Sequence, residues 1–305
     1  MKPILISGNR TVEDVLRRHF EEQAQKPAVP RGRNPPPPPP PSGAGTPAVT
    51  PAVTPAVTSL ADYIKLENIV CVDAEGNEFE RYGELYVKKD VEKDAAGQIL
   101  KVTPYAAIQR CEQSGFLPSA ALMANIHVAI YRAAVERQSD GTYQTKNAEL
   151  EQMLQKLKNR GDGVGGHWVN TVVNWGTQQL IHYPQDADFP SPGGTAGINA
   201  SRPRKVFGFD KTSLKDMGLK DALQIPHFKR YLQCYSGLAD PAILLEVAQY
   251  HQETARSWVS SSGDVRAAWL GCDQDNFDLN SYYLILYNTN AARGVRLDSP
   301  RSGAP

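Results

Sequence analysis

Three aspartates near the C-terminus are spaced closely enough to share a cation. Asp273, Asp275 and Asp278 follow Cys272, and clustered carboxylates are the ligands that Ca²⁺ prefers. The spacing departs from the calcium loop of EF-hand proteins, because Phe277 stands at a ligand position and the required glycine is missing. We therefore expect no cofactor, with calcium as the alternative.

Other residues with potential chemistry give weaker signals. His167 and His182 lie too far apart in sequence to form a helical metal pair, and we expect both to be hydrogen-bonded structural histidines. The run Gly161–Gly166 lacks the Lys-Ser/Thr pair of a phosphate-binding loop and follows a helical pattern instead of a strand. No Ser-His-Asp arrangement is deducible from sequence order. We therefore predict no catalytic residues, no metal and no enzyme activity.

The segment Asp275–Asn290 has the composition of a recognition surface. Tyrosine supplies a large amphipathic contact area with few rotatable bonds, while asparagine and serine supply adaptable hydrogen bonds. The alternative is that the polar residues only form turns between strands, which does not account for three tyrosines among them. The predicted ligand-binding residues are Asp273, Asp275, Asn276, Asp278, Asn280, Ser281, Tyr282, Tyr283, Tyr287, Asn288 and Asn290.

Several stretches, in the right order, resemble the formylglycine-generating-enzyme branch of the C-type lectin fold. They are Val102–Gly115 with its Val-Thr-Pro-Tyr start, Leu117-Pro118-Ser119 with the helix that follows to Ala134, and the C-terminal elements Ser257-Trp258, Val265–Ala268 and Gly294–Arg296. Together they span most of Ala61–Leu297. The resemblance implies an α+β fold, a C-type-lectin-like domain over residues 59–300 with early helices and short, loop-rich C-terminal strands.

The chain also departs from that family. Leu122 and Met123 stand where a tryptophan usually follows the Leu-Pro-Ser/Thr start, and the paired catalytic cysteines have no counterpart. Cys272 is a single candidate for such chemistry. A formylglycine-generating-type copper oxidase using Cys272 is therefore an alternative function, and a calcium-dependent carbohydrate lectin is another.

A narrower resemblance is to the variable proteins of diversity-generating retroelements, which use the same branch of the fold. Adenine-directed mutagenesis of AAY codons at their first two positions never produces Lys, Glu, Gln, Met or Trp, and none of these occurs in Asp275–Asn290. The frames Val265–Gly271 and Ala291–Arg296 flank the segment. The resemblance implies a ligand-binding receptor whose variable region covers about residues 273–290.

The elements that must position this region are visible as patterns along the chain. Alternating apolar residues predict strands at Ile69–Val72 and Leu85–Val87. Helices are predicted after Thr103, from a Ser119 cap, over Asn147–Arg160, and after Asp216 and Asp240. Beyond Gly161 the chain is expected to be rich in loops, with short strands at its end. Arg293 or Arg296 is expected to pin neighbouring loops through carboxylate or carbonyl groups.

The N-terminal part has a different composition. Residues 1–26 predict one short helical segment, with Thr11 as its cap. Residues 27–58 hold a proline run and three Pro-Ala-Val-Thr repeats, which predict an extended linker. We expect residues 1–58 to join the head to a carrier protein.

Overall composition limits the partners. Lys plus Arg and Asp plus Glu both number 33, so we expect no nucleic-acid partner, and the short basic run Arg202–Lys205 reads as a solvated loop or strand edge. Four widely spaced cysteines do not form a disulfide framework. Neither a signal-peptide core nor a membrane span is present. We expect a cytoplasmic protein without membrane insertion, with export by a signal-free route or assembly into a phage-like particle as alternatives.

Overall fold

The computed structural model describes most of the chain between residues 60 and 296 and two short strands near the N-terminus. The described ranges are 5–6, 10–11, 60–94, 96–112, 115–158, 167–183, 205–260, 265–273, 276–281 and 292–296. The chain divides into two units, Met1–Val53 and Thr54–Pro305. In the first unit, β1 (Leu5–Ile6) pairs antiparallel with β2 (Arg10–Thr11). The predicted helix after Thr11 and the proline-rich linker lie outside the described residues.

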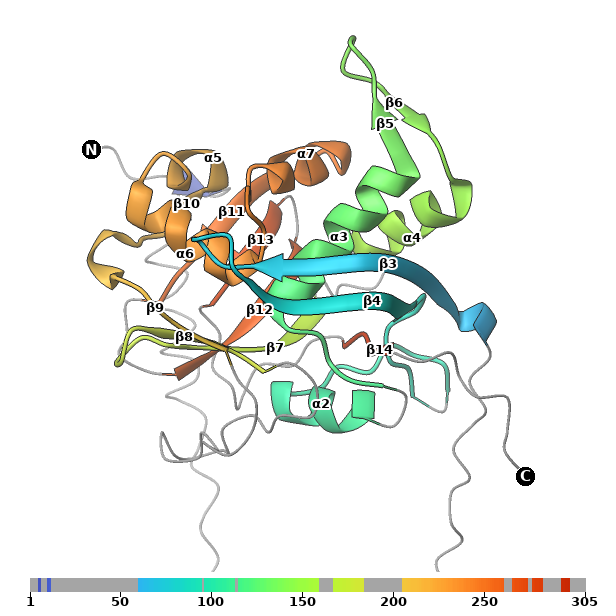
Figure 1. Ribbon diagram of the computed structural model, residues 1–305, viewed down its shortest axis with the longest axis horizontal. Coiled ribbons are helices and arrows are strands. Elements are labelled where there is room, and N and C mark those ends of the chain that lie inside the picture. Colours follow the sequence, from blue (N-terminus) through green and yellow to red (C-terminus); the bar gives the residue numbers. More distant parts are fainter. Residues whose placement is uncertain are drawn as a thin grey trace, which may run out of the picture. The chain divides into compact units, whose positions relative to one another are not determined.

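A three-stranded sheet joins the start of the second unit to its end. β3 (Tyr63–Val72) and β4 (Glu78–Lys88) form an antiparallel hairpin, and β14 (Val295–Arg296) pairs with the other edge of β4 (Figure 1). Asp73 closes the hairpin turn, because its carboxylate accepts the backbone N–H of Asn77 at 2.8 Å. The strands predicted here are confirmed.

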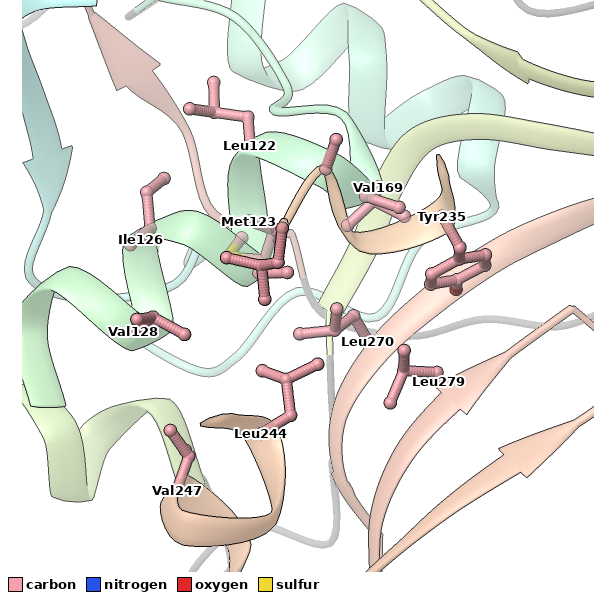
Figure 2. Packing of buried hydrophobic residues seen from close by; sticks show 14 of the residues in the cluster. Leu122, Met123, Ile126, Val128, Val169, Tyr235, Leu244, Val247, Leu270 and Leu279 are labelled. Carbon is pink, nitrogen blue, oxygen red and sulfur yellow. The ribbon is translucent and has the colours of Figure 1, made fainter. Parts of the chain in front are cut away.

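The helix α3 (Ala120–Ala134) lies at the centre of the core. Ser119 caps it as predicted, since its Oγ accepts the backbone N–H of Leu122 at 3.0 Å. Most of its side chains are buried, because the helix packs against β3 and against strands of a second, seven-stranded sheet. Figure 2 shows its residues packed against apolar side chains from later elements, among them Val169, Tyr235, Leu244, Val247, Leu270 and Leu279.

The larger sheet has seven strands and curls into a half-barrel (Figure 1). Its order is β10-β11-β13-β12-β7-β8-β9, and all neighbours are antiparallel except the parallel pair β11-β13. The strands are β7 (His167–Asn174), β8 (Gln179–His182), β9 (Lys205–Gly208), β10 (Met217–Gly218), β11 (Thr254–Trp258), β12 (Val265–Asp273) and β13 (Asn276–Asn280).

Helices cover both faces of this sheet around β7. Val169 and Val173 belong to the same buried cluster as α3, whereas Trp168 and Val172 pack with the helix α2 (Pro104–Glu112). The loop-rich reading beyond Gly161 was therefore wrong for β7 and β8. A strand buried on both faces carries no alternation of apolar and polar residues, so its β-branched and aromatic content was the only signal.

The helices predicted after Thr103, over Asn147–Arg160, and after Asp216 and Asp240 are present, whereas the helix at Pro226–Ser236 was not predicted. The helix predicted after Thr103 is α2, and Pro104 is its first residue. The helices and short strands not yet named are η1 (Leu60–Asp62), β5 (Val135–Arg137), β6 (Tyr143–Thr145), α4 (Ala148–Lys158), η3 (Lys211–Ser213), α5 (Leu219–Ala222), α6 (Pro226–Ser236) and α7 (Ile243–Tyr250). The fold is thus α+β. Among the described helices, none is both long enough and apolar enough to cross a membrane.

Candidate ligand-binding surface

The first part of the predicted binding segment forms β13, an inner strand of the large sheet. β13 pairs with β12 on one side and β11 on the other, so its backbone groups are used within the sheet. Phe277 and Leu279 are buried in the core. Asn276, at the start of the strand, is half-buried, and Thr254 Oγ1 donates to its Oδ1 at 2.7 Å.

Three of the predicted binding residues are buried, which corrects the expectation that the whole segment lies at the surface. Asp278, Asn280 and Ser281 are 3%, 5% and 1% exposed. An inner strand of a sheet that is covered on both faces buries polar and apolar side chains alike. We therefore remove these three residues from the binding surface and assign them to the framework.

Ser281, the last described residue before 282–291, is held by hydrogen bonds to the core. Its backbone N–H donates to the carbonyl of Trp258 at 3.0 Å, and its own carbonyl accepts the indole N–H of Trp175 at 3.2 Å. Its hydroxyl lies 3.2 Å from Tyr231 Oη. These contacts come from three separate elements, so the position of Ser281 is determined by the core.

Most of the other predicted binding residues lie outside the described part of the chain. Tyr282, Tyr283, Tyr287, Asn288 and Asn290 lie outside the described residues, as does Asp275. For Asp273 and Cys272, at the end of β12, only the backbone is described; Asp273 pairs with Asn276 and Cys272 with Phe277.

The described chain resumes at Ala292, where a second set of contacts holds it. The carbonyl of Ala292 accepts the backbone N–H of Glu92 at 2.8 Å, and the carbonyl of Gly294 accepts that of Lys88 at 3.2 Å. Arg293 is fully buried, and its Nη1 donates to the carbonyls of Lys88, at 2.7 Å, and Lys89. The prediction that an arginine here pins a neighbouring loop through carbonyl groups is confirmed for Arg293.

β14 is held from its other side as well. The N–H of Phe116 donates to the carbonyl of Val295 at 2.8 Å, and the carbonyl of Phe116 accepts the N–H of Val295 at 2.9 Å. Gly115 permits this approach, because a Cβ at that position would lie 2.0 Å from the Val295 carbonyl oxygen. The described residues on either side of 282–291 are thus both held by the core: Ser281, inside the predicted variable segment, and Ala292–Arg296, after it.

Two histidines, His127 on α3 and His167 on β7, are fully buried. Burial, with a smaller contribution from the positive charge of Arg293, lowers the pKa of His127 from its ordinary value of 6.5 to about 4. Burial also holds the pKa of His167, on β7, well below its usual range, with contributions from Arg293 and His127. Neither ring nitrogen of His167 has a hydrogen-bond partner in the described part of the chain. The expectation of a hydrogen-bonded histidine is therefore wrong for His167.

His182 meets that expectation. Its Nε2 lies 2.9 Å from the carbonyl of Cys234, which only accepts, so Nε2 carries the proton. Its Nδ1 therefore accepts from Thr171 Oγ1 at 2.8 Å. Burial lowers the pKa of His182 to about 4, and the ring is neutral and fully paired within the core.

The described residues contain no group of three or more His, Cys, Asp or Glu side chains arranged to hold a metal ion. Cys71, Cys111 and Cys234 are buried free thiols, as expected for structural cysteines. Burial raises the pKa of the thiols of Cys71 and Cys234, which keeps them protonated and poorly nucleophilic.

Comparison with family models, with curated proteins and with solved structures finds no match to this chain.

Proposed function

We propose that this protein is a ligand-binding receptor that displays a diversified segment on a C-type-lectin-like scaffold. Within the segment, Asp278, Asn280 and Ser281 belong to the buried framework, and the remaining predicted residues would contact the ligand. The observation that carries the proposal is the composition of Asp275–Asn290: it is rich in Tyr and Asn, and it lacks all five residues that mutagenised AAY codons never encode.

The arrangement of the described residues supports this proposal in two ways. A binding segment gains affinity when its ends are held in place, because less conformational entropy is then lost on binding. Ser281 and Ala292–Arg296 are both fixed to the core by hydrogen bonds. The scaffold is α+β, and β14 pairs with β4, so the described chain after residue 291 joins the same sheet as the β3–β4 hairpin.

The partner in this proposal is a protein or another surface ligand, contacted by the tyrosines as anchors and by the polar residues as adaptable donors and acceptors. Residues 1–58 would connect the head to a carrier. Removal of residues 1–58 should leave target binding intact and abolish carrier assembly. A head that fails to fold without them would contradict this division of roles.

The direct test is genetic. We expect the DNA around the gene to contain a near-copy of the codons for residues 265–296 that differs from them almost only at template adenines, together with a reverse-transcriptase reading frame. Such a copy would mark the variable positions one by one. If the neighbourhood contains neither a copy nor a reverse transcriptase, the proposal of a diversified receptor fails.

A further inference from the structure

A pocket of about 450 Å³ lies between the turn that joins β7 to β8, the end of β9 and the first half of α6. Its lining combines two aromatic side chains, Phe209 and Tyr231, with polar ones, among them Gln178, Asp210 and Arg230. An apolar wall with a few polar groups beside it is the usual composition of a ligand site.

The aromatic wall of the pocket belongs to a packed cluster that holds it in place. The ring centroids of Phe209 and Tyr231 lie 5.1 Å apart in an edge-on arrangement, and Phe209 meets Trp175 at the same distance. The carbonyl of Gln178 also accepts the backbone N–H of Phe209 at 3.0 Å. The rings are therefore fixed before a ligand binds, and the faces of aromatic rings attract cations.

Asp210 supplies a carboxylate that is held in position but has room for a partner. It is exposed, and its Oδ1 accepts the backbone N–H of Thr212 at 2.9 Å and the hydroxyl of Thr212 at 2.7 Å. These two hydrogen bonds hold the pKa of Asp210 below its ordinary value, so the carboxylate is charged at neutral pH. Its second oxygen, Oδ2, accepts no hydrogen bond from the described residues.

The other formal charges around the pocket are already used. Arg230 forms an ion pair with Glu75. Lys211 follows Asp210 in the chain but is not part of the lining, and its Nζ donates to the carbonyl of Trp175 at 3.3 Å. With histidine counted as neutral, Asp210 is therefore the unbalanced charge of the lining, and it lies beside the aromatic wall.

The pocket adjoins the point where the chain enters residues 282–291. Tyr231 Oη lies 3.2 Å from Ser281 Oγ, and the indole of Trp175 donates to the Ser281 carbonyl at 3.2 Å. The aromatic cluster that forms the wall thus also holds the last described residue before the predicted variable positions. The residues that line the pocket all lie outside the segment 273–290.

We propose that this pocket is a constant subsite that takes a cationic side chain, lysine or arginine, from a protein ligand. The cation lies against the aromatic wall and pairs with the carboxylate of Asp210. Since the pocket lies outside the diversified segment, every variant of the receptor would carry it, and the variable residues beside it would select among ligands. This division of roles rests on the proposed function, whereas cation binding by the pocket does not.

Titration of the full chain with small probes tests the subsite. The cationic probes are the Nα-acetyl amides of lysine and arginine, and the Nα-acetyl amide of norleucine is a neutral probe of similar length. In nuclear magnetic resonance spectra at pH 7, we expect a cationic probe to shift the amide signals of Gln178, Phe209 and Asp210 saturably. Added salt should weaken this binding, because it screens exposed charges. No saturable shift with either cation, or equal binding of norleucine, would overturn the proposal.

Asp210→Asn is the decisive variant, because asparagine keeps the acceptor for Thr212 and removes only the charge. We expect it to weaken binding of the cationic probes about fivefold. The matched control is Asp140→Asn in the β5–β6 turn, where Oδ1 accepts the N–H and the hydroxyl of Thr142 at 2.9 and 2.6 Å. It removes the same charge from the same local motif, away from the pocket, and should leave binding unchanged.

Equal effects of the two substitutions, or no effect of Asp210→Asn, would contradict the subsite. If Asp210→Asn does not fold, the comparison of lysine with norleucine on the unmodified chain decides. The subsite and the proposed function also fail separately, because the small probes need no diversified segment. Conversely, the search for a template copy in the DNA says nothing about Asp210.

Discussion

The carboxyl of Glu80 and the ring of His167 are both buried in the same unit of the protein, but only Glu80 has its hydrogen bonds made. Ser119 Oγ donates to one carboxyl oxygen at 2.9 Å and Tyr82 Oη donates to the other at 3.0 Å. The Cys71 thiol adds a third hydrogen bond. His167 has no such partner in the described residues.

The two sites also respond to pH in opposite directions. Burial raises the pKa of Glu80, and its three hydrogen bonds only partly offset this. The folded state thus holds that proton more tightly than the unfolded state does, and its stabilising contribution is lost as the pH rises through the folded pKa. Burial lowers the pKa of His167, so its contribution is lost as the pH falls below 6.5. Burial thus destabilises the charged form of either side chain, and the hydrogen bonds made to that form decide by how much.

Removing the buried guanidinium of Arg293 should have the largest effect. Arg293→Ala leaves the carbonyls of Lys88 and Lys89 without their donor and opens a cavity, so we expect the free energy of unfolding to fall by about 4 kcal/mol. Urea denaturation at pH 7 measures it. Arg296→Ala, at the half-buried end of β14, is the matched control and should cost under about 1 kcal/mol. Similar losses in the two variants would show that the side chain of Arg293 has no special role.

An intermediate effect is expected at Ser119, where the start of α3 meets the carboxyl of Glu80. Ser119→Ala removes both the cap on Leu122 and a donor to buried Glu80, so the free energy of unfolding should fall by about 2–3 kcal/mol. Thr103→Ala removes a weaker cap, whose hydroxyl accepts from the N–H of Ala106 at 3.4 Å, and should cost about 0.5 kcal/mol. Thermal or urea denaturation compares them; equal costs would mean that the Glu80 contact contributes nothing.

The smallest effect separates charge from shape. Glu80→Gln keeps the size of the side chain and removes its titration, so stability should change by about 1 kcal/mol or less at pH 4.5. As the pH rises to 8, the variant should become more stable relative to the unmodified protein. In the unmodified protein, the buried carboxyl of Glu80 must then either ionise in the core or keep a proton that the unfolded chain would release. Denaturation at the two pH values is the measurement. A difference that does not vary with pH would contradict the raised pKa.

Much of the framework was predictable because its signals are local. The caps at Thr103 and Ser119, the proline that begins α2, and the alternation in β3 and β4 depend on neighbours within a few residues. These features gave the α+β class and the position of α3. The strand β7 was not predictable in this way, because burial on both faces removes the alternation that identifies a strand.

The composition of Asp275–Asn290, and with it the proposed recognition chemistry, is a property of the sequence alone. Which of those residues lie in the framework was decided by tertiary structure: β13 fits between β11 and β12, and this buries Asp278, Asn280 and Ser281. The contacts of Arg293 with Lys88, Lys89 and Lys156 were decided in the same way, since three distant segments supply them. Spacing along the chain carries no information on contacts of that kind, because they form only when packing of the core brings remote elements together.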